Sequence, residues 1–272
     1  MTDRIKVFAM TTRQLEDPEV FERYYQERST DRREKIDRIR MPQDKRLSLA
    51  AGILLDEGLR TYALREAEVR VCKGEYGKPY FPDFPEIHFN LSHSGNIALA
   101  VFADREVGCD IEYRKRTNEA LARRFFCRKE ADWMLAAPGE KEKEERFYRI
   151  WTLKESFLKA TGQGLHLPLN SFCFTFRDCK LEEGFPSFPS EEKYGRQEPE
   201  NTAESIKGQI NSISGGSACQ SIPLETGDGA VLQKRRDSFV SVSGQSDGAC
   251  YEFMEFCAGS DGEYCAAVCV RG

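Results

Sequence analysis

The sequence lacks any apolar run long enough to span a membrane, and its start lacks the features of a secreted protein. The first ten residues, MTDRIKVFAM, carry charges at Asp3, Arg4 and Lys6 in place of the apolar stretch of a signal peptide. We therefore expect a cytoplasmic protein with no membrane partner. A large excess of positive charge is also missing, because the formal net charge is -5 at pH 7, and this argues against nucleic acid as a partner.

Cysteine pairs with C-x-x-C spacing are absent too, although ten cysteines are scattered along the 272 residues. Without such pairs we do not expect a zinc site. Several cysteines stand inside apolar runs such as ACYEFMEFC and YCAAVCV, where a free cysteine behaves as a small hydrophobe. This favours reduced, buried thiols over a disulfide framework.

The composition that remains is that of a globular protein, with 40% hydrophobic residues, which is enough for one large core or two domains of roughly 100 residues or more. Alternating polarity predicts strands, and apolar spacing near 3.6 residues predicts helices. By these patterns we expect strands at 4–9, 89–92, 97–103, 171–176, 251–257 and 264–270. Helices are expected at 18–28, 47–64, 118–137 and 147–160, with a charged connector, GEKEKEER, before the last of them.

A polar segment interrupts this pattern from about residue 185 to 248. It is dominated by Ser, Gly, Glu, Gln and Pro, has few aromatic residues and shows no sustained period of either kind. Such a composition cannot bury enough apolar surface to offset the entropy of ordering, so it favours a mobile or disordered insert over a folded one.

The most informative stretch is IALAVFADREVGCDIE, residues 97–112, which ends in two carboxylates separated by one apolar residue. In a strand, Asp110 and Glu112 share one face. Paired carboxylates suit a hard cation such as Mg²⁺, which proteins usually hold with one or two carboxylates together with substrate phosphates. By itself the doublet is also common on solvated strand ends.

Three other features are ambiguous when taken singly. His93, one of only three histidines, stands between serines at a strand end, where it is either structural or placed to contact an anion. The helix at 147–160 is ended by Gly162 and Gly164 and presents Lys154, Glu155 and Lys159 together. A basic segment forms either a solvated helix face or an anion site, and it contains Arg32, Arg33, Lys35, Arg38, Arg40, Lys45 and Arg46.

The order of three motifs, FNLSHSG, GCDIE and WTLKESFLKATG, resembles that of the 4′-phosphopantetheinyl transferases, and most of all the broad-range, surfactin-synthetase-activating type. GKPYFPDFPEIHFNLSHSG is similar to the family's GKP and NxSHS segment, GCDIE to its G-x-D-x-E, and FYRIWTLKESFLKATGQGL to its W-x-x-K-E-x-x-x-K-x-x-G. STDRREK and RFFCRKE add to the likeness, which covers residues 1 to about 178 and resumes at about 250.

The resemblance implies an α+β fold, a two-lobed pseudo-dimer in which each lobe packs a long helix against a small antiparallel sheet. The lobes would be residues 1–105, which bind the nucleotide end, and 106–272, which carry the metal site and the catalytic helix. Coenzyme A would lie in the cleft between them, and the chain would cross from one lobe to the other near Arg105.

The implied reaction moves the 4′-phosphopantetheine arm of coenzyme A to a serine of an apo carrier protein and releases 3′,5′-adenosine bisphosphate. By resemblance Asp110, Glu112 and Glu155 hold Mg²⁺, and Glu130 matches a further acidic position of the cleft. Glu155 is the candidate base for the serine proton, directly or through water. Positive charge for the phosphates would come from Lys154 and Lys159, while His93 would bind and stabilise charge together with Ser92.

The basic segment gains a role from the same resemblance. Arg32, Lys35 and Arg46 would grip the 3′-phosphate end of coenzyme A, and Lys78 of the GKP motif would lie along the adenine. Arg32 stands where a lysine is expected, a change that keeps the charge and permits bidentate phosphate contact.

The partner implied is an acyl or peptidyl carrier protein with an acidic helix beside its serine, and the enzyme is expected to act as a monomer. One rival interpretation is a non-catalytic coenzyme A-binding module, whose mark would be the loss of an acidic ligand or of the Lys154 and Glu155 pair; all of these residues are present. Another Mg²⁺-dependent phosphotransferase or a nuclease would predict a P-loop or an HD or DxD cluster, and the sequence has none of these.

Overall fold

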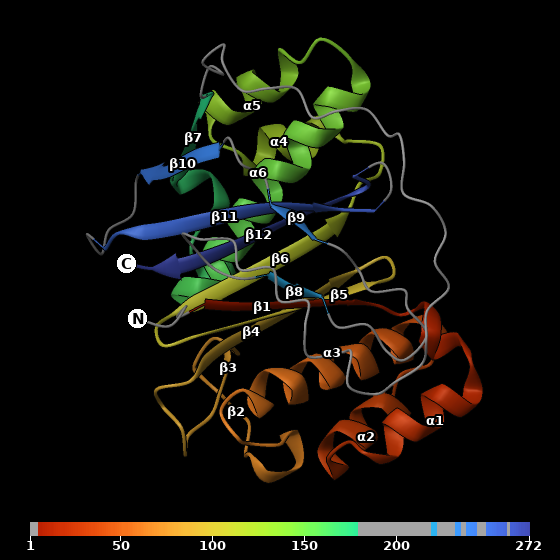
Figure 1. The fold of residues 1–272 in the computed structure, drawn as a ribbon. Helices are drawn as coiled ribbons and strands as arrows, with labels where there is room; N and C mark the ends of the chain where they lie inside the picture. Colours follow the sequence, from red (N-terminus) through yellow and green to blue (C-terminus); the bar gives the residue numbers. More distant parts are fainter. Residues whose placement is uncertain (1–4, 179–218, 222–231, 235–237, 244–248, 260–261) are drawn as a thin grey trace, which may run out of the picture.

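The computed structural model describes residues 5–178, 219–221, 232–234, 238–243, 249–259 and 262–272. Two sheets lie face to face at the centre of the molecule, and a long helix covers the outer side of each (Figure 1). The layers therefore run helix, sheet, sheet, helix. This is the α+β fold with two sheet-and-helix units that the sequence predicted.

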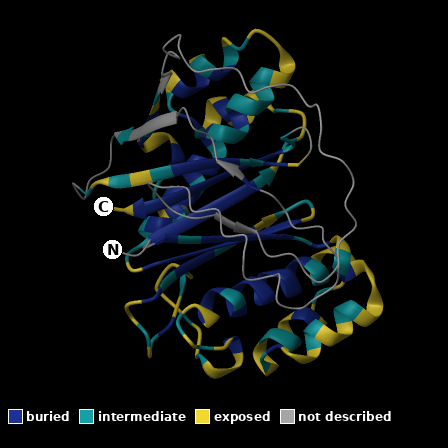
Figure 2. Cartoon of the chain, in the orientation of Figure 1, coloured by how far each residue is buried: buried dark blue, intermediate teal, exposed yellow. Residues whose placement is uncertain are grey.

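The first sheet has the order β4-β5-β1-β8. Its strands are β4 (His88–Ser94), β5 (Ile97–Ala103), β1 (Ile5–Thr11) and β8 (Cys219–Ser221), and β5 pairs antiparallel with both β1 and β4. Every residue of β5 is buried, because helix α3 (Pro42–Arg60) covers one face of this sheet and the second sheet covers the other. Two shorter helices, α1 (Pro18–Gln26) and α2 (Thr30–Asp37), pack outside α3 and expose their outer sides (Figures 1 and 2).

The second sheet has the order β6-β12-β11-β9. Its strands are β6 (Val107–Tyr113), β12 (Tyr264–Arg271), β11 (Tyr251–Ala258) and β9 (Gln233–Lys234). Helix α6 (Glu140–Thr161) lies on β6 and β12, with α4 (Glu119–Phe125) and α5 (Arg128–Leu135) beside it. A separate ladder pairs β7 (Cys173–Asp178) with β10 (Ser238–Ser243), and β2 (Cys72–Lys73) pairs with β3 (Pro79–Tyr80).

Edge strands β4 and β6 lie side by side where the two sheets meet. The Asn90 side-chain oxygen accepts a hydrogen bond from the Cys109 backbone N–H at 3.0 Å, and Ser94 Oγ accepts one from the Tyr113 N–H at 3.0 Å. Side chains of β4 thus take the place of a regular backbone ladder. As a result, the FNLSHSG and GCDIE motifs face each other across this junction.

Close packing of α6 on β6 depends on Gly108. A Cβ at this position would collide with the backbone of α6 at Ser156 and Ala160, so only glycine allows the helix to approach so closely. Helix α6 ends at Gly162, which has a φ of 70° and serves as its left-handed C-cap, as the sequence indicates.

Several element boundaries differ from those expected. Helix α6 begins at Glu140, so the segment GEKEKEER is helical and not a connector, because glutamates in a first turn interact favourably with the helix dipole. The helix expected at 118–137 is two helices, broken between Phe125 and Arg128. Helix α3 starts at Pro42, a residue suited to the first helical position.

The expectation of reduced thiols needs one correction, because Cys127 and Cys173 form a disulfide. Six other described cysteines are not disulfide-bonded: Cys72, Cys109, Cys250, Cys257, Cys265 and Cys269. Burial accounts for the expectation: Cys109, Cys265 and Cys269 do lie in the core, as small hydrophobes.

Two predictions stay untested. Most of the insert expected at 185–248 lies outside the described residues, and β8, β9 and β10 are its described parts. The lobe boundary near residue 105 also stays a prediction. No helix in the described part of the chain is long and apolar enough to cross a membrane.

Candidate active site

Asp110 is the centre of the candidate site. It projects from β6, its residue is 4% exposed, and its Oδ1 accepts hydrogen bonds from Lys159 Nζ at 2.7 Å and from Ser92 Oγ at 2.9 Å. Its other oxygen, Oδ2, is buried and has no hydrogen-bond partner. A buried carboxylate oxygen is costly to leave unpaired, so Oδ2 is available to a cation.

Two further carboxylates interact electrostatically with Asp110. Ser94 Oγ donates a hydrogen bond to Glu112 Oε2 at 2.9 Å, while Glu155 lies on α6. Burial raises the pKa of Glu112, and the negative charge of Asp110 adds to this shift. Burial and the charge of Asp110 likewise raise the pKa of Glu155. The three acids therefore repel one another, which is what a cation between them would relieve.

Lys159 supplies the compensating charge at this site. Burial is the largest single effect on Lys159 and would lower its pKa, but the combined effects of Asp110, Cys109 and Glu155 outweigh it and raise the pKa overall. Lys159 and Glu155 are four residues apart on α6 and so share one face of the helix.

The donor set fits a hard cation such as Mg²⁺, because it consists of carboxylate oxygens, one of them buried without a partner. The three acids do not form a tight cluster, however. Within the described ranges, the one group of metal-ligating side chains whose atoms all lie within 4.8 Å of one another is Cys127, Glu130 and Cys173.

His93 and Lys35 lie on the other side of the junction. His93 is exposed on β4, and its pKa is lowered by partial desolvation, by Lys159 and by Lys35. The pKa of Lys35 is lowered by burial, by Arg32 and by Lys73. Because these basic side chains influence one another's pKa values, they form a group near the acids, where they could receive phosphate groups. Lys73 was not among the residues predicted, because nothing in its local sequence marks it.

A cavity of about 270 Å³ opens beside Glu155. Its walls come from the GKP loop, β4 and α6, and are formed by Tyr76, Gly77, Lys78, Pro79, Asn90, Glu155, Leu158, Lys159, Gly162 and Gly164. A second cavity of about 350 Å³ shares Tyr76, Lys78, Pro79 and Gly162 with the first. Sequence reasoning predicted Lys78, Glu155 and Lys159 here but missed Tyr76, Asn90 and Leu158; only Asn90 had a signal, as part of FNLSHSG.

Lys78 ties the two units together next to the cavity. Its Nζ donates hydrogen bonds to Glu106 Oε2 at 2.5 Å and to the Ala160 carbonyl at 2.8 Å. The ammonium thus fixes the GKP loop to the C-terminal end of α6.

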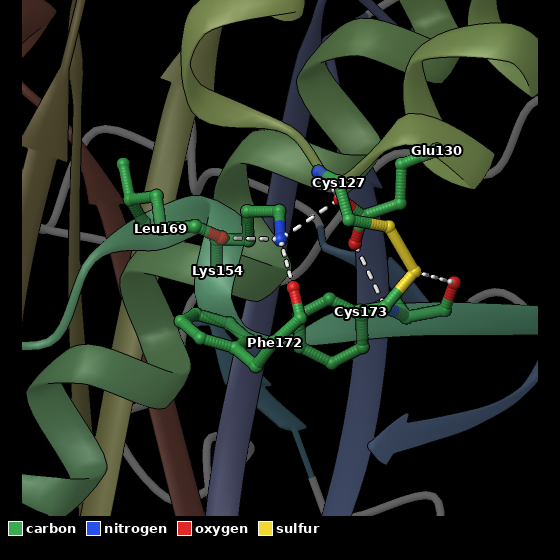
Figure 3. Close-up of a disulfide and its surroundings, with 7 residues drawn as sticks. Cys127, Glu130, Lys154, Leu169, Phe172 and Cys173 are labelled. Carbon is green, nitrogen blue, oxygen red and sulfur yellow. Dashed lines mark hydrogen bonds and ion pairs between the residues drawn. A yellow bond between two sulfur atoms is a disulfide. The ribbon is translucent and has the colours of Figure 1, made fainter. Parts of the chain in front are cut away.

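Lys154 corrects one prediction from the sequence. Its side chain is 0% exposed, and its Nζ donates to the carbonyls of Leu169 at 2.8 Å and Phe172 at 2.9 Å (Figure 3). The same Nζ pairs with Glu130 Oε2 at 2.8 Å. Lys154 therefore does not reach a phosphate in the cavity, because it points to the opposite side of α6 from Lys159.

Glu130 is corrected together with Lys154. Its two oxygens accept the backbone N–H groups of Cys127 at 2.8 Å and Phe174 at 2.7 Å, and its side chain is 0% exposed. Burial raises the pKa of Glu130 and lowers that of Lys154, because desolvation disfavours both charged forms, while their attraction works in the opposite direction. These contacts make Glu130 part of a structural anchor and not a ligand beside Asp110.

The arginines expected at the 3′-phosphate have protein partners. Arg32 Nε donates to Glu66 Oε1 at 3.0 Å, and an Arg46 nitrogen lies 3.9 Å from Glu16 Oε1. Arg32 is 11% exposed at its side chain and Arg46 23%, so both retain limited access to solvent. Their contact with a phosphate stays a prediction.

The candidate site is thus a set of acids and lysines at the junction of two sheet-and-helix units. Comparison with known proteins identifies the class. The family model of the 4′-phosphopantetheinyl transferase superfamily matches residues 106–203. The chain is 39% identical to the 4′-phosphopantetheinyl transferase Sfp of Bacillus subtilis (strain 168) over 152 residues, which is 56% of this chain and 67% of the relative.

Other relatives agree. The chain is 34% identical to the 4′-phosphopantetheinyl transferase psf-1 of Bacillus pumilus over 172 residues, 62% of this chain and 73% of that protein. It is 38% identical to HetI of Nostoc sp. over 144 residues, 50% of this chain and 60% of that protein. The chain belongs to the 4′-phosphopantetheinyl transferase superfamily, as the motifs predicted, and is a transferase that modifies carrier proteins. This family uses coenzyme A and typically Mg²⁺.

Proposed function

We propose that this chain transfers the phosphopantetheine arm of coenzyme A to a carrier-protein serine at the junction of β4 and β6, with Asp110, Glu112 and Glu155 as the ligands of Mg²⁺. The unpartnered, buried Oδ2 of Asp110 is the observation that carries this proposal. Bound there, Mg²⁺ would neutralise phosphate charge and polarise phosphorus.

The residues around the acids divide the remaining work. Lys159, whose pKa is raised chiefly by Asp110 against the effect of burial, stays protonated and offers positive charge to the phosphates. His93 and Lys35 extend this positive region from the other unit, with Ser92 orienting Asp110 through its hydroxyl. Arg32, Arg46 and Lys78 are proposed to contact the nucleotide end of coenzyme A.

Glu155 is proposed to accept the proton of the attacking serine, directly or through a water molecule. The serine Oγ forms a bond to the β-phosphorus, the bond from phosphorus to the bridging oxygen breaks, and 3′,5′-adenosine bisphosphate leaves. A raised pKa suits Glu155 to this role, because a base works best when its pKa lies nearer the working pH. The side chain also lines the cavity, so a substrate there can reach it.

The test compares two conservative changes on α6. Glu155→Gln keeps the shape of the side chain but removes the charge, and we expect at least about a 100-fold loss of labelled-pantetheine transfer to apo carrier domains. Glu144→Gln, on the same helix, is the matched control and should transfer normally. A panel of fatty-acid, polyketide and peptide carrier domains with fluorescent coenzyme A provides the readout.

Two results would contradict the proposal. Transfer by Glu155→Gln within a few-fold of the wild type would remove Glu155 from the reaction. A wild type that is thermally stabilised by coenzyme A yet labels no carrier domain in the panel would favour the alternative, a non-catalytic coenzyme A-binding module with the same fold.

A further inference from the structure

The disulfide of Cys127 and Cys173 lies outside the active site. It joins the N-cap of α5 to the first residue of β7, across 46 residues of sequence. Both residues are half-buried, unlike the fully buried Cys109, Cys265 and Cys269. Burial raises the pKa of Cys109 to about 12, so that thiol is inert at neutral pH, whereas Cys127 and Cys173 each keep part of their surface exposed to solvent.

The contacts around the bridge hold its two ends in place. Glu130 accepts the N–H of Cys127 on one side and the N–H of Phe174, the residue after Cys173, on the other. Figure 3 shows the bridge and this carboxylate side by side, with Lys154 completing the group. Because one buried carboxylate fixes the backbone on both sides, the two sulfur atoms are brought together whether or not they are bonded.

We propose that Cys127 and Cys173 form a reversible thiol modification site, a dithiol and disulfide pair that controls the stability of the unit carrying α6. The inference is independent of the transfer reaction, since the bridge contacts none of Asp110, Glu155 or Lys159. In the oxidised state the chain is closed into a loop between α5 and β7, which restricts the unfolded state and raises thermal stability.

The exchange is balanced with a low-molecular-weight disulfide such as oxidised glutathione. The thiolate of one cysteine attacks a sulfur of the reagent, forms a mixed disulfide and releases one thiol. The second cysteine then attacks the mixed disulfide, releases the second thiol and closes the bridge. Two protein thiols are oxidised, one small disulfide is reduced to two thiols, and a dithiol reagent reverses the steps.

A metal site is the other use for this group, because Cys127, Glu130 and Cys173 have ligand spacing. The contacts argue against it. Both carboxylate oxygens of Glu130 already accept backbone N–H groups, and the Lys154 ammonium at 2.8 Å would repel a cation. The zinc content of the reduced protein is therefore measured in the test, because bound zinc would support the metal site.

The experiment equilibrates the full chain in glutathione buffers from reducing to oxidising, alkylates free thiols and maps peptides by mass spectrometry. We expect a peptide that links Cys127 to Cys173, abolished by dithiothreitol. The midpoint of thermal unfolding should rise on oxidation by on the order of 5–10 °C. Cys127→Ser with Cys173→Ser should lose this response, whereas the exposed Cys250→Ser, the matched control, should keep it.

Four results would overturn the proposal. Two come from the peptide map: full alkylation of both cysteines in every buffer, or linkage of either one to a different cysteine. The third is a midpoint of thermal unfolding that does not respond to oxidation. The fourth is stoichiometric zinc in the reduced wild type that is lost in the double variant. Carrier labelling at a temperature well below the midpoint should change less than about two-fold between the redox states, since the bridge is a stability device. A larger change would also count against it. Failure of carrier labelling in every state would contradict the transfer reaction and leave the thiol result standing.

Discussion

The sharpest prediction concerns Lys154, which the motif assigns to the phosphates and the structure assigns to a buried anchor. Lys154→Met removes the charge and keeps most of the volume. Its ammonium has three partners, the carboxylate of Glu130 and the carbonyls of Leu169 and Phe172, and it also lies 4.4 Å from the centre of the Phe172 ring. Removing it leaves the buried Glu130 carboxylate with its two backbone N–H donors but without its ion-pair partner.

The expected loss follows from that burial. Breaking a buried pair by removing one partner costs about 3–5 kcal/mol of unfolding free energy, since the remaining charge is uncompensated. This is a large part of the roughly 5–15 kcal/mol that holds a typical protein folded. Glu130→Gln alongside Lys154→Met removes the second charge and keeps an acceptor oxygen for one of the two backbone N–H groups, those of Cys127 and Phe174. The double variant should therefore recover about 1–3 kcal/mol relative to the sum of the single changes.

Urea unfolding followed by circular dichroism measures these free energies, and carrier labelling at low temperature measures transfer. Lys159→Met is the matched control on the same helix; its side chain is 28% exposed, so it should lose transfer with a smaller loss of stability. If Lys154→Met unfolds within about 0.5 kcal/mol of the wild type, as surface changes do, yet fails to transfer, then the anchor is wrong and Lys154 acts on the phosphates.

Two other predictions concern the fold. Gly108→Ala should cost about 3 kcal/mol or more of unfolding free energy, because its Cβ would collide with α6. The same change at Gly139 meets open space and alters only the N-cap of α6, so it should cost about 1 kcal/mol or less. Thermal melts distinguish the two variants, and equal effects would refute the close packing. The pKa of His88 is lowered below its ordinary value of 6.5, chiefly by burial, so the unfolded state binds the proton more tightly and stability falls as the pH drops through that value. His88→Asn should flatten this part of the pH profile of stability, and an unchanged profile would contradict the burial argument.

Local patterns carried much of the fold. Alternation identified β1, continuous apolar runs identified β5 and β12, and the turn between β4 and β5 followed from the small polar residues after Ser92. The errors occurred where local signals compete. Charge alone does not distinguish a solvated connector from the first turns of a solvated helix, so the start of α6 at Glu140 was missed.

For the candidate site, the motifs predicted which residue types are present but not always the direction in which each side chain points. Asp110 and Glu112 share a strand face because side chains alternate strictly, so their relation was readable without a fold. The proximity of Cys127 and Cys173 was not readable, since it depends on how β7 packs beside α5 across 46 residues of sequence. The lining of the cavity by Tyr76 depends in the same way on the GKP loop meeting α6.

The sequence by itself determined the family, the order of the motifs and the identity of the acids and lysines that we propose carry the chemistry. Only the tertiary structure decided which lysine of α6 lies beside Asp110. A helix fixes the angle between Lys154 and Lys159, but its packing on β6 and β12 sets which of them faces Asp110 and which is buried beside Glu130. Periodicity is a local property of the chain, whereas the direction of a helix face is settled by the surfaces that pack against it.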